Sequence, residues 1–381
     1  MFTSRATRAL TALTLGVLPI TAAACGSSSS SASKPDTSAT TAKAASTAPV
    51  DLRLGYFPNV THAPALIGIE GGIFEQKLGK NVTLKPQSFN AGPDVATAIF
   101  SGALDASFIG PGPSISAFQK SNGDAIRIVA GAGSGGAFLV VKPSITSAAD
   151  LKGKKIASPQ LGNTQDIALR TWLKSKGYTT DTSGGGEVSV VPQENSITLT
   201  TFEQGQIDGA WVPEPWATRL VKEGGGKVLV DERDLWPGGK FVTTDLIVRK
   251  AFLDEHPDVV KQLILGEIAA IALTKSDRTK AEGYVADGIQ KATGKAIAPA
   301  LVTASFDSIT FTVDPIVSSL EKNASDSAAL GLISSKDVKG IYDLSILNSL
   351  QTAAGVPDVQ GGLTGPPVST YFDYLNPTDR Q

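Results

Sequence analysis

Polar side chains follow several apolar runs of this sequence at points where a helix is expected to begin. The first such loop carries Asn59, Thr61 and His62. It follows an expected strand at 52–57, and Pro64 opens the helix behind it. Free backbone N–H groups at a helix start favour an anion or a carbonyl oxygen. The loop therefore predicts half of a binding site, although capping of the helix by Asn59 and Thr61 is a competing interpretation.

Four further strand-to-helix loops carry residues that could also bind an anion or a carbonyl oxygen. Glycines permit close backbone approach, amides and hydroxyls are neutral donors, and indoles offer a stacking surface. Ligands of open α/β sheets sit beyond the carboxyl ends of strands, so we expect these loops to share one cleft. Their candidate contact residues are Gly112, Ser114, Gln160, Gly162, Asn163, Thr164, Glu194, Asn195, Trp211, Glu214 and Trp216. For Trp211, packing within the core is the competing interpretation.

Nothing in these loops is typical of catalysis. The two histidines are too few for a multi-histidine metal site, and the serines lack a G-x-S-x-G elbow. An acid–base pair of Glu194 and Glu214 has no fixed separation. We therefore expect a binding protein without a metal or cofactor.

The expected ligand is a small oxyanion. The cleft loops contain no Arg or Lys, so neutral donors and helix dipoles would hold a singly charged group such as a sulfonate. Its affinity would then depend little on salt. Glu194 or Glu214 could hold an amine, which favours a zwitterion. A neutral nitrogen heterocycle stacked on Trp211 or Trp216 is the alternative.

Short apolar runs alternate with helical patterns and predict an α/β fold. Expected strands lie at 52–57, 82–89, 106–110, 126–132, 154–158, 188–192, 207–212 and 227–231. Expected helices lie at 63–78, 93–102, 113–121, 164–176, 197–204 and 215–223, followed by a helical segment at 257–353. The glycine-rich run 131–136 predicts a turn at the cleft floor.

Two extended runs, 137–142 and 241–249, flank the second group of strands. They predict two chain crossings between two lobes, each a mainly parallel sheet flanked by helices. Lobe I would comprise 51–142 and 243–355, lobe II 143–242, and the C-terminal tail 356–381.

The N-terminus is typical of an exported lipoprotein. A positive start precedes an apolar run at 9–20, and the small residues 22–24 lead to Cys25, the only cysteine. We predict a signal peptide at 1–25 with lipidation at Cys25, and a disordered Ser/Thr/Ala-rich tether at 26–50. An ordinary cleaved signal peptide is the competing interpretation. With 34 basic and 36 acidic residues and no basic block, no nucleic-acid partner is expected.

Four of these stretches together resemble one family. Residues 54–64, the Gly-rich loop at 110–114, and residues 160–166 and 209–216 are similar to the substrate-binding proteins of ABC importers for sulfonates, taurine, nitrate and bicarbonate. The resemblance implies a two-lobed, type II periplasmic-binding-protein-like fold with a two-strand hinge. It also implies a permease and its ATPase as partners. With the lipoprotein-like N-terminus, we expect a monomer anchored by lipid at the outer face of the cytoplasmic membrane, on the cell surface or in the periplasm.

The resemblance leaves the ligand open. An aliphatic sulfonate or taurine is expected, with nitrate, bicarbonate or a thiamine-precursor pyrimidine as alternatives. The pyrimidine branch of the family includes enzymes that need a cysteine cluster for iron. This chain has a single cysteine, so the enzyme interpretation is disfavoured.

Overall fold

The structure of the protein, a computed structural model, describes residues 48–355 and 358–359. The expected signal peptide with Cys25, nearly all of the 26–50 tether and nearly all of the 356–381 tail lie outside the described residues. None of the described helices is both long and apolar enough to cross a membrane.

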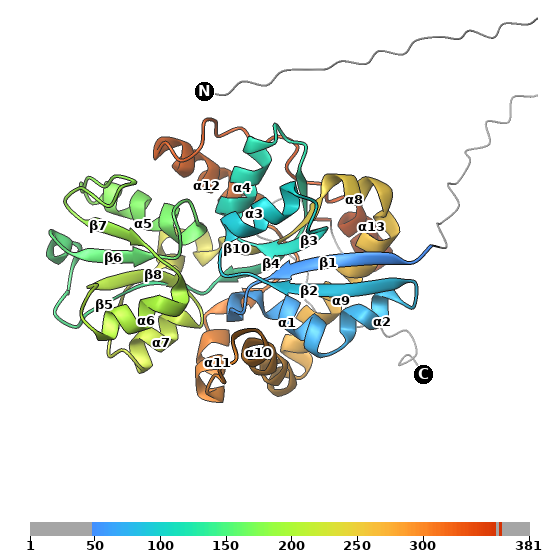
Figure 1. Ribbon diagram of the computed structural model, residues 1–381, viewed down its shortest axis with the longest axis horizontal. Helices are drawn as coiled ribbons and strands as arrows, with labels where there is room; N and C mark the ends of the chain where they lie inside the picture. The colour runs from blue at the N-terminus through green and yellow to red at the C-terminus, as the bar shows by residue number, and fades with distance from the viewer. Residues whose placement is uncertain (1–47, 356–357, 360–381) are drawn as a thin grey trace, which may run out of the picture. The chain divides into compact units, whose positions relative to one another are not determined.

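Two β-sheets organise the described chain, and we call each sheet with its covering helices a lobe (Figure 1). The six-stranded sheet of lobe I has the order β11-β4-β10-β3-β1-β2, with strands β1 Val50–Tyr56, β2 Val82–Ser88, β3 Ala106–Ile109, β4 Ile126–Gly135, β10 Val242–Arg249 and β11 Ile309–Phe311. The five-stranded sheet of lobe II has the order β7-β6-β8-β5-β9, with strands β5 Ala137–Val141, β6 Lys155–Ser158, β7 Ser189–Pro192, β8 Gly209–Pro213 and β9 Lys227–Asp231. The expected two-lobed α/β architecture is confirmed.

Both sheets are mixed rather than mainly parallel. In lobe I, β1 runs parallel to β2 and β3, whereas β10 is antiparallel to β3 and β4. In lobe II, β6 runs parallel to β7 and β8, whereas β5 is antiparallel to β8 and β9. The difference arises because β5 and β10 each enter their sheet from the other lobe. By its pairing β5 belongs to lobe II, so the change of sheet falls at Gly136 rather than at 142.

Helices cover both faces of the lobe I sheet. One apolar cluster lies beneath α1 Ala63–Glu70, α2 Ile73–Leu78, α9 Pro257–Ser276 and α10 Arg278–Thr293, and also includes residues of α8 Lys250–Glu255, α11 Pro299–Phe306 and α13 Ser345–Ala353. A second cluster lies beneath α3 Gly92–Phe100, α4 Pro111–Lys120 and α12 Val317–Ala329. The helix expected at 63–78 is divided in two, because Gly72 takes a positive φ of 66°.

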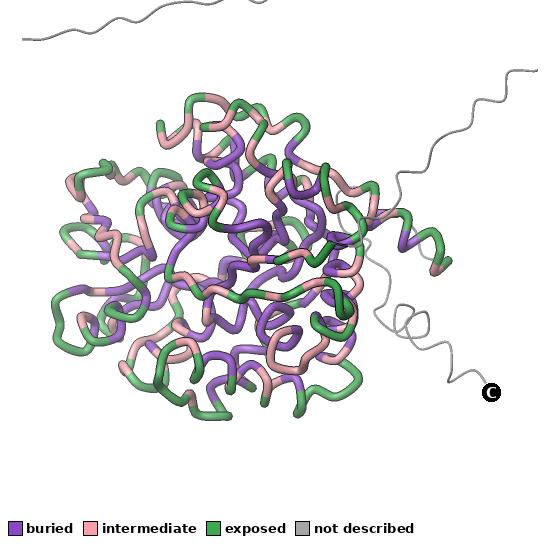
Figure 2. The backbone as a smooth tube through the Cα atoms, turned by 45° about the vertical axis from the view of Figure 1, so that its right-hand side comes forward, coloured by how far each residue is buried: buried purple, intermediate pink, exposed green. Residues whose placement is uncertain are grey.

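Lobe II repeats this three-layer plan on a smaller scale. Helix α5 Thr164–Ser175 covers one apolar cluster, and α6 Asn195–Glu203 with α7 Trp216–Lys222 covers the other. Short 3-10 turns are η1 Val60–His62, η2 Ala148–Leu151, η3 Glu232–Leu235 and η4 Pro237–Gly239. Figure 2 shows the buried backbone inside both lobes and the exposed residues on their outer loops and helices.

The chain passes between the lobes at Gly135-Gly136 and again through residues 232–241. Strand β4 continues through Gly135, so the turn expected at 131–136 is confined to two glycines. Gly135 and Gly136 have φ values of 83° and 69°. A Cβ atom on Gly136 would lie 2.4 Å from the Cγ1 atom of Ile309. Only glycine readily takes the positive φ and also leaves room for Ile309 at position 136, so the backbone conformation of this crossing depends on glycine.

Candidate ligand-binding cleft

A small cavity of about 20 Å³ lies between the lobes, and we call it the inner compartment. Six residues predicted from the sequence line it together: Asn59, Thr61, His62, Asn163, Thr164 and Asn195. The remaining lining residues are Phe57, Asn90, Gly110, Pro159, Gln165, Pro213 and Thr243. A space of this size holds about one water molecule. The convergence of polar groups from both lobes makes it the centre of the candidate site.

Helix α5 points its N-terminus at the inner compartment. Asn163 is the N-cap residue, and its side chain makes no capping hydrogen bond. The backbone N–H groups of Thr164 and Gln165 have no acceptor among the described residues. Unpaired N–H groups and the helix dipole together favour an anion at this point.

A buried carboxylate fixes the loop that leads into α5. The Asp166 carboxylate accepts hydrogen bonds from Ser158 Oγ at 2.6 Å and from the Gly162 N–H at 3.0 Å. It also accepts from Arg170 Nε at 3.0 Å, and both side chains of this ion pair are buried. The loop is therefore held in place before a ligand arrives, which lowers the entropic cost of binding.

His62 presents a neutral donor. Its Nδ1 atom accepts from the Phe57 N–H at 3.3 Å, and the two rings lie 4.5 Å apart. Burial lowers the pKa of His62 to about 3, so the ring is neutral at physiological pH. Because Nδ1 accepts, the proton lies on Nε2, which has no partner among the described residues. Nε2–H is thus available to a ligand in the inner compartment.

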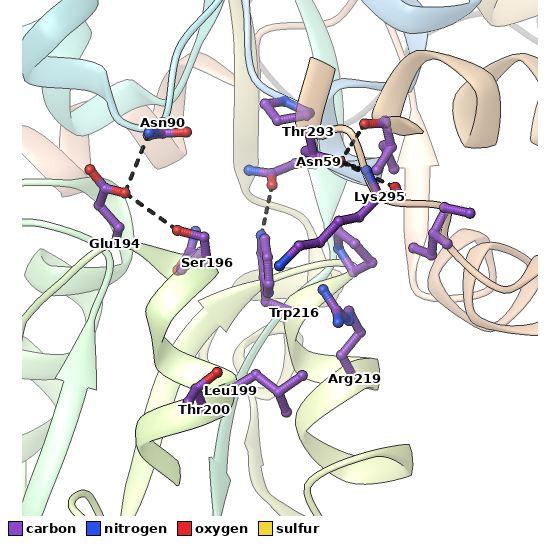
Figure 3. Close-up of a pocket in the computed structure, with 16 residues that line it drawn as sticks. Asn59, Asn90, Glu194, Ser196, Leu199, Thr200, Trp216, Arg219, Thr293 and Lys295 are labelled. Atoms are coloured by element: carbon purple, nitrogen blue, oxygen red, sulfur yellow. Dashed lines mark hydrogen bonds between the residues drawn. The ribbon is translucent and has the colours of Figure 1, made fainter. Parts of the chain in front are cut away.

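A larger cavity of about 280 Å³ adjoins the inner compartment, and we call it the outer cavity (Figure 3). Asn59, Asn90 and Asn195 line both spaces and frame the passage between them. The other lining residues are Pro58, Glu194, Ser196, Leu199, Thr200, Pro215, Trp216, Arg219, Ile289, Thr293, Lys295, Ala296 and Ile297. Both lobes contribute, so a molecule bound there would contact each of them.

Hydrogen bonds across the lobes order the passage between the two spaces. The Trp216 indole donates from Nε1 to Asn59 Oδ1 at 2.9 Å, which leaves the Asn59 NH2 group as a donor. Glu194 accepts from Asn90 Nδ2 at 3.4 Å and from Ser196 Oγ at 3.3 Å. Figure 3 shows Glu194 on the opposite side of Trp216 from Arg219. Glu194 and Trp216 therefore line the cleft as predicted, but in its outer part.

Two cations line the outer cavity, although the strand-to-helix loops contain none. Arg219 lies with its guanidinium 5.0 Å from the Trp216 ring centre, and its Nε donates to Glu223 at 2.8 Å. Lys295 is exposed and forms no ion pair with another described residue. Both were missed because neither lies in a strand-to-helix loop of the expected set. Arg219 lies three positions after Trp216 on the same helix, so the two side chains share one face, and the sequence could have shown this. No comparable sequence pattern indicates Lys295.

The structure places several other predicted residues outside both spaces. The indole of Trp211 donates to Glu232 Oε2 at 2.7 Å and packs edge-on against Trp172 in the core of lobe II. Ser114 Oγ donates to the carbonyl of Gly110, the N-cap residue of α4. Gln160 is half-buried, and Gly162 donates its N–H to Asp166. Trp211 faces inward because strand β8 is buried along its whole length.

Two further predicted residues join the lobes instead of lining the cavities. The Gly112 N–H donates to Thr164 Oγ1 at 3.3 Å, and a Cβ atom at Gly112 would lie 2.8 Å from Ile167. The buried Glu214 carboxylate accepts from Ser305 Oγ of lobe I at 3.1 Å. Burial also raises the pKa of Glu214. These contacts keep the lobes together in the present conformation.

Comparison with known proteins identifies the family of this chain. A model of the NMT1-like family matches residues 45–287. The chain is 30% identical over 208 residues to the taurine-binding periplasmic protein of Escherichia coli K12, which covers 54% of this chain and 62% of that protein. It is 26% identical over 251 residues to a putative aliphatic sulfonates-binding protein of the same strain, covering 64% and 73%. The chain thus spans less than two thirds of its taurine-binding relative.

Solved structures show the same fold. The alkanesulfonate-binding protein SsuA from Xanthomonas axonopodis pv. citri, bound to MOPS, superposes with a TM-score of 0.63 at 19% identity, over 76% of this chain and 96% of that one. The nitrate-binding protein NrtA from Synechocystis PCC 6803 gives 0.66 at 15% identity, over 86% and 98%. These relatives and neighbours are binding proteins, not enzymes. The chain belongs to the NMT1-like family and has the fold of type II periplasmic binding proteins.

Proposed function

We propose that this protein is the solute-binding component of an ABC importer and that it captures a small organic sulfonate for delivery to a permease and its ATPase. The observation that carries the proposal is the convergence of neutral donors from both lobes on the inner compartment. The taurine- and sulfonate-binding functions of its relatives support the same class of ligand.

The donor set suits a sulfonate head group. Its three oxygens would accept from His62 Nε2–H, the Asn59 NH2 group and the N–H groups at the start of α5. A sulfonate is singly charged and weakly hydrated, so neutral donors suffice to replace its water shell. The organic part would extend into the outer cavity, where Leu199 and Ile289 provide apolar surface.

Binding requires the lobes to move. The inner compartment, about 20 Å³ in volume, is smaller than a sulfonate group, so the head group enters only when the lobes separate. Separation would break the Gly112–Thr164, Asn59–Trp216 and Glu214–Ser305 contacts, and the bound ligand would replace part of them. We therefore assign the two crossings at 135–136 and 232–241 as the hinge.

Calorimetric titration of the purified protein tests the proposal. The panel contains butanesulfonate, taurine, nitrate, bicarbonate and a thiamine-precursor pyrimidine. We expect sub-millimolar affinity for sulfonates only, recovery of the compound unmodified, and a smaller radius of gyration in solution scattering than for the open, ligand-free protein. Binding of nitrate or the pyrimidine alone would assign the site to another ligand class, and turnover of a bound compound would make the protein an enzyme.

We also propose that Cys25 carries a lipid that holds the protein, as a monomer, at the outer face of the cytoplasmic membrane. The lipobox-like run 22–25 and the lack of any other cysteine support this assignment. Cys25→Ser should release the protein from membranes without changing its thermal unfolding. Mature wild-type protein without a diacylglyceryl group in its mass spectrum would contradict the proposal.

A further inference from the structure

The outer cavity contains more positive charge than a simple alkanesulfonate would use. Arg219 from lobe II and Lys295 from lobe I both line it, and Glu194 is the only acidic residue among its lining. Figure 3 shows the Lys295 side chain reaching across the cavity toward Trp216, on the side where Arg219 lies. A sulfonate head in the inner compartment would leave both cations without an anionic partner from the ligand.

The side chains of Arg219 and Lys295 differ in how firmly other residues hold them. The Arg219 guanidinium is held against the Trp216 ring and by Glu223 through Nε, and its two NH2 groups have no acceptor among the described residues. The Lys295 ammonium has no ion-pair partner in the described part of the chain. A planar carboxylate suits the fixed guanidinium, and a flexible lysine can close on it from the other lobe.

Glu194 does not neutralise this pair of cations. It lies on the other side of Trp216, where Asn90 and Ser196 donate to its carboxylate. The outer cavity is thus divided into an acidic side and a basic side, with the indole and apolar side chains such as Leu199 between them. The basic side is the one with unused donors.

We propose that the outer cavity selects a sulfonate that carries a second acidic group, with a carboxylate at the end of a short aliphatic spacer held between Arg219 and Lys295. This inference rests on the proposed function, because the sulfonate head must occupy the inner compartment. The second acid would bridge cations of opposite lobes, so it would stabilise the closed form as well as add affinity.

Three ligands of matched length test this inference by calorimetry at low salt. Sulfopropionate carries the second acid. Isopentanesulfonate has an isopropyl group in its place, and aminopropanesulfonate has an aminomethyl group. We expect wild-type protein to bind sulfopropionate at least about tenfold more tightly than isopentanesulfonate, as expected for one well-placed charge-assisted contact.

Lys295→Gln and Arg219→Gln should each remove most of that preference, measured in each protein as the ratio of its affinities for sulfopropionate and isopentanesulfonate. Lys291→Gln is the matched control, because Lys291 lies on α10, pairs with Glu70 at 2.6 Å and lines neither space. It should retain the full preference. Lys295 is exposed, so its variant should fold normally.

The possible results distinguish a failure of the two-acid proposal from a failure of the proposed sulfonate-binding function. Equal affinity for sulfopropionate and isopentanesulfonate would overturn the inference and leave a sulfonate-binding protein. Tightest binding of aminopropanesulfonate would overturn it in favour of Glu194 as the tail partner. A preference for sulfopropionate that survives both Gln variants would overturn the assignment to Arg219 and Lys295. Failure of all three sulfonates to bind would overturn the proposed function itself.

Discussion

The two spaces of the cleft use polar groups of different kinds. The inner compartment offers amides, a neutral imidazole and backbone N–H groups, nearly all of them buried. The outer cavity offers two cations and a carboxylate on side chains that keep contact with water. Burying an ion costs several kcal/mol unless it is fully paired, whereas a buried neutral donor costs less. The comparison suggests that the inner compartment supplies affinity for the head group and that the outer cavity discriminates among tails.

The largest expected effect comes from placing a negative charge in the inner compartment. Asn163→Asp is nearly isosteric, and the free N–H groups and dipole at the start of α5 offset part of the cost of burying its carboxylate. Thermal unfolding of the variant checks that it remains folded at the titration temperature. Two unit charges about 4 Å apart repel by about 4 kcal/mol at an effective dielectric constant near 20. Calorimetry should therefore show the affinity for a sulfonate falling by about a thousandfold.

Asn163→Ala is the control that removes a donor without adding charge. Its loss should be about 3-fold to 100-fold, corresponding to roughly 0.5–3 kcal/mol for one hydrogen bond. If Asn163→Asp and Asn163→Ala lose the same affinity, the ligand's charge does not sit at the start of α5. If neither variant loses affinity, the site lies elsewhere.

The second effect concerns His62 and the neutrality of the inner compartment. The folded-state pKa of about 3 lies below the ordinary value of 6.5, so neutral His62 contributes stability above pH 6.5 that is lost as pH falls toward 3. From about pH 7.5 to about pH 5, this residue alone should lower the free energy of unfolding by about 2 kcal/mol. Urea denaturation at the two pH values measures the change.

His62→Gln keeps a polar side chain that does not titrate, so its change in the free energy of unfolding between the two pH values should differ from that of the wild-type protein by about 2 kcal/mol. Buried carboxylates such as Glu232, whose pKa is raised to about 7, contribute equally to both proteins and cancel in this difference. An unchanged slope in His62→Gln would mean that His62 is protonated in the folded protein. The inner compartment would then be charged like the outer cavity, and the contrast between them would fail.

Sequence reasoning found the inner compartment because its residues obey one local rule. Asn59, Thr61, Asn163 and Thr164 each lie between a strand end and a helix start, and such ends meet at the same edge of a sheet. Asn90 obeys the same rule, because it lies in the loop between β2 and α3, but it was not among the predicted residues. The two-lobed fold was predictable for the same reason, since strands and helices alternate visibly in each lobe.

The rest depended on contacts between distant segments. Lys295 enters the outer cavity from the loop after α10, and no local pattern relates it to Trp216. The orientation of Trp211 depended on which face of β8 meets α5, and a fully buried strand has no alternation that shows this. The mixed sheets followed from β5 and β10 crossing between lobes, which strand patterns alone do not orient.

A smaller effect is expected at the boundary between the two spaces. Trp216→Phe removes the indole N–H and leaves Asn59 Oδ1 without its partner, while the ring that supports Arg219 remains. Loss of one neutral hydrogen bond should weaken sulfonate binding by about 3- to 10-fold. Trp172→Phe is the matched control, because Trp172 packs against Trp211 in the core of lobe II and lines neither space. Equal losses in both variants would mean that the effect is one of stability rather than of the site.

The smallest effect is the response of a simple alkanesulfonate to salt. Donors of the inner compartment alone would make the affinity almost independent of ionic strength, as expected from the loops. Lys295 is exposed, lines the outer cavity and attracts an approaching anion. We therefore expect a two- to fivefold loss of butanesulfonate affinity between about 20 and 500 mM salt. In Lys295→Gln the dependence should become shallower, mainly through the association rate, while the Lys291→Gln control keeps the wild-type slope. The same dependence of affinity on salt in the wild-type protein and in both variants would show that Lys295 does not affect a ligand held only by its head group. The inner compartment would then alone determine the affinity for the head group, and the outer cavity would act only on the tail of the ligand.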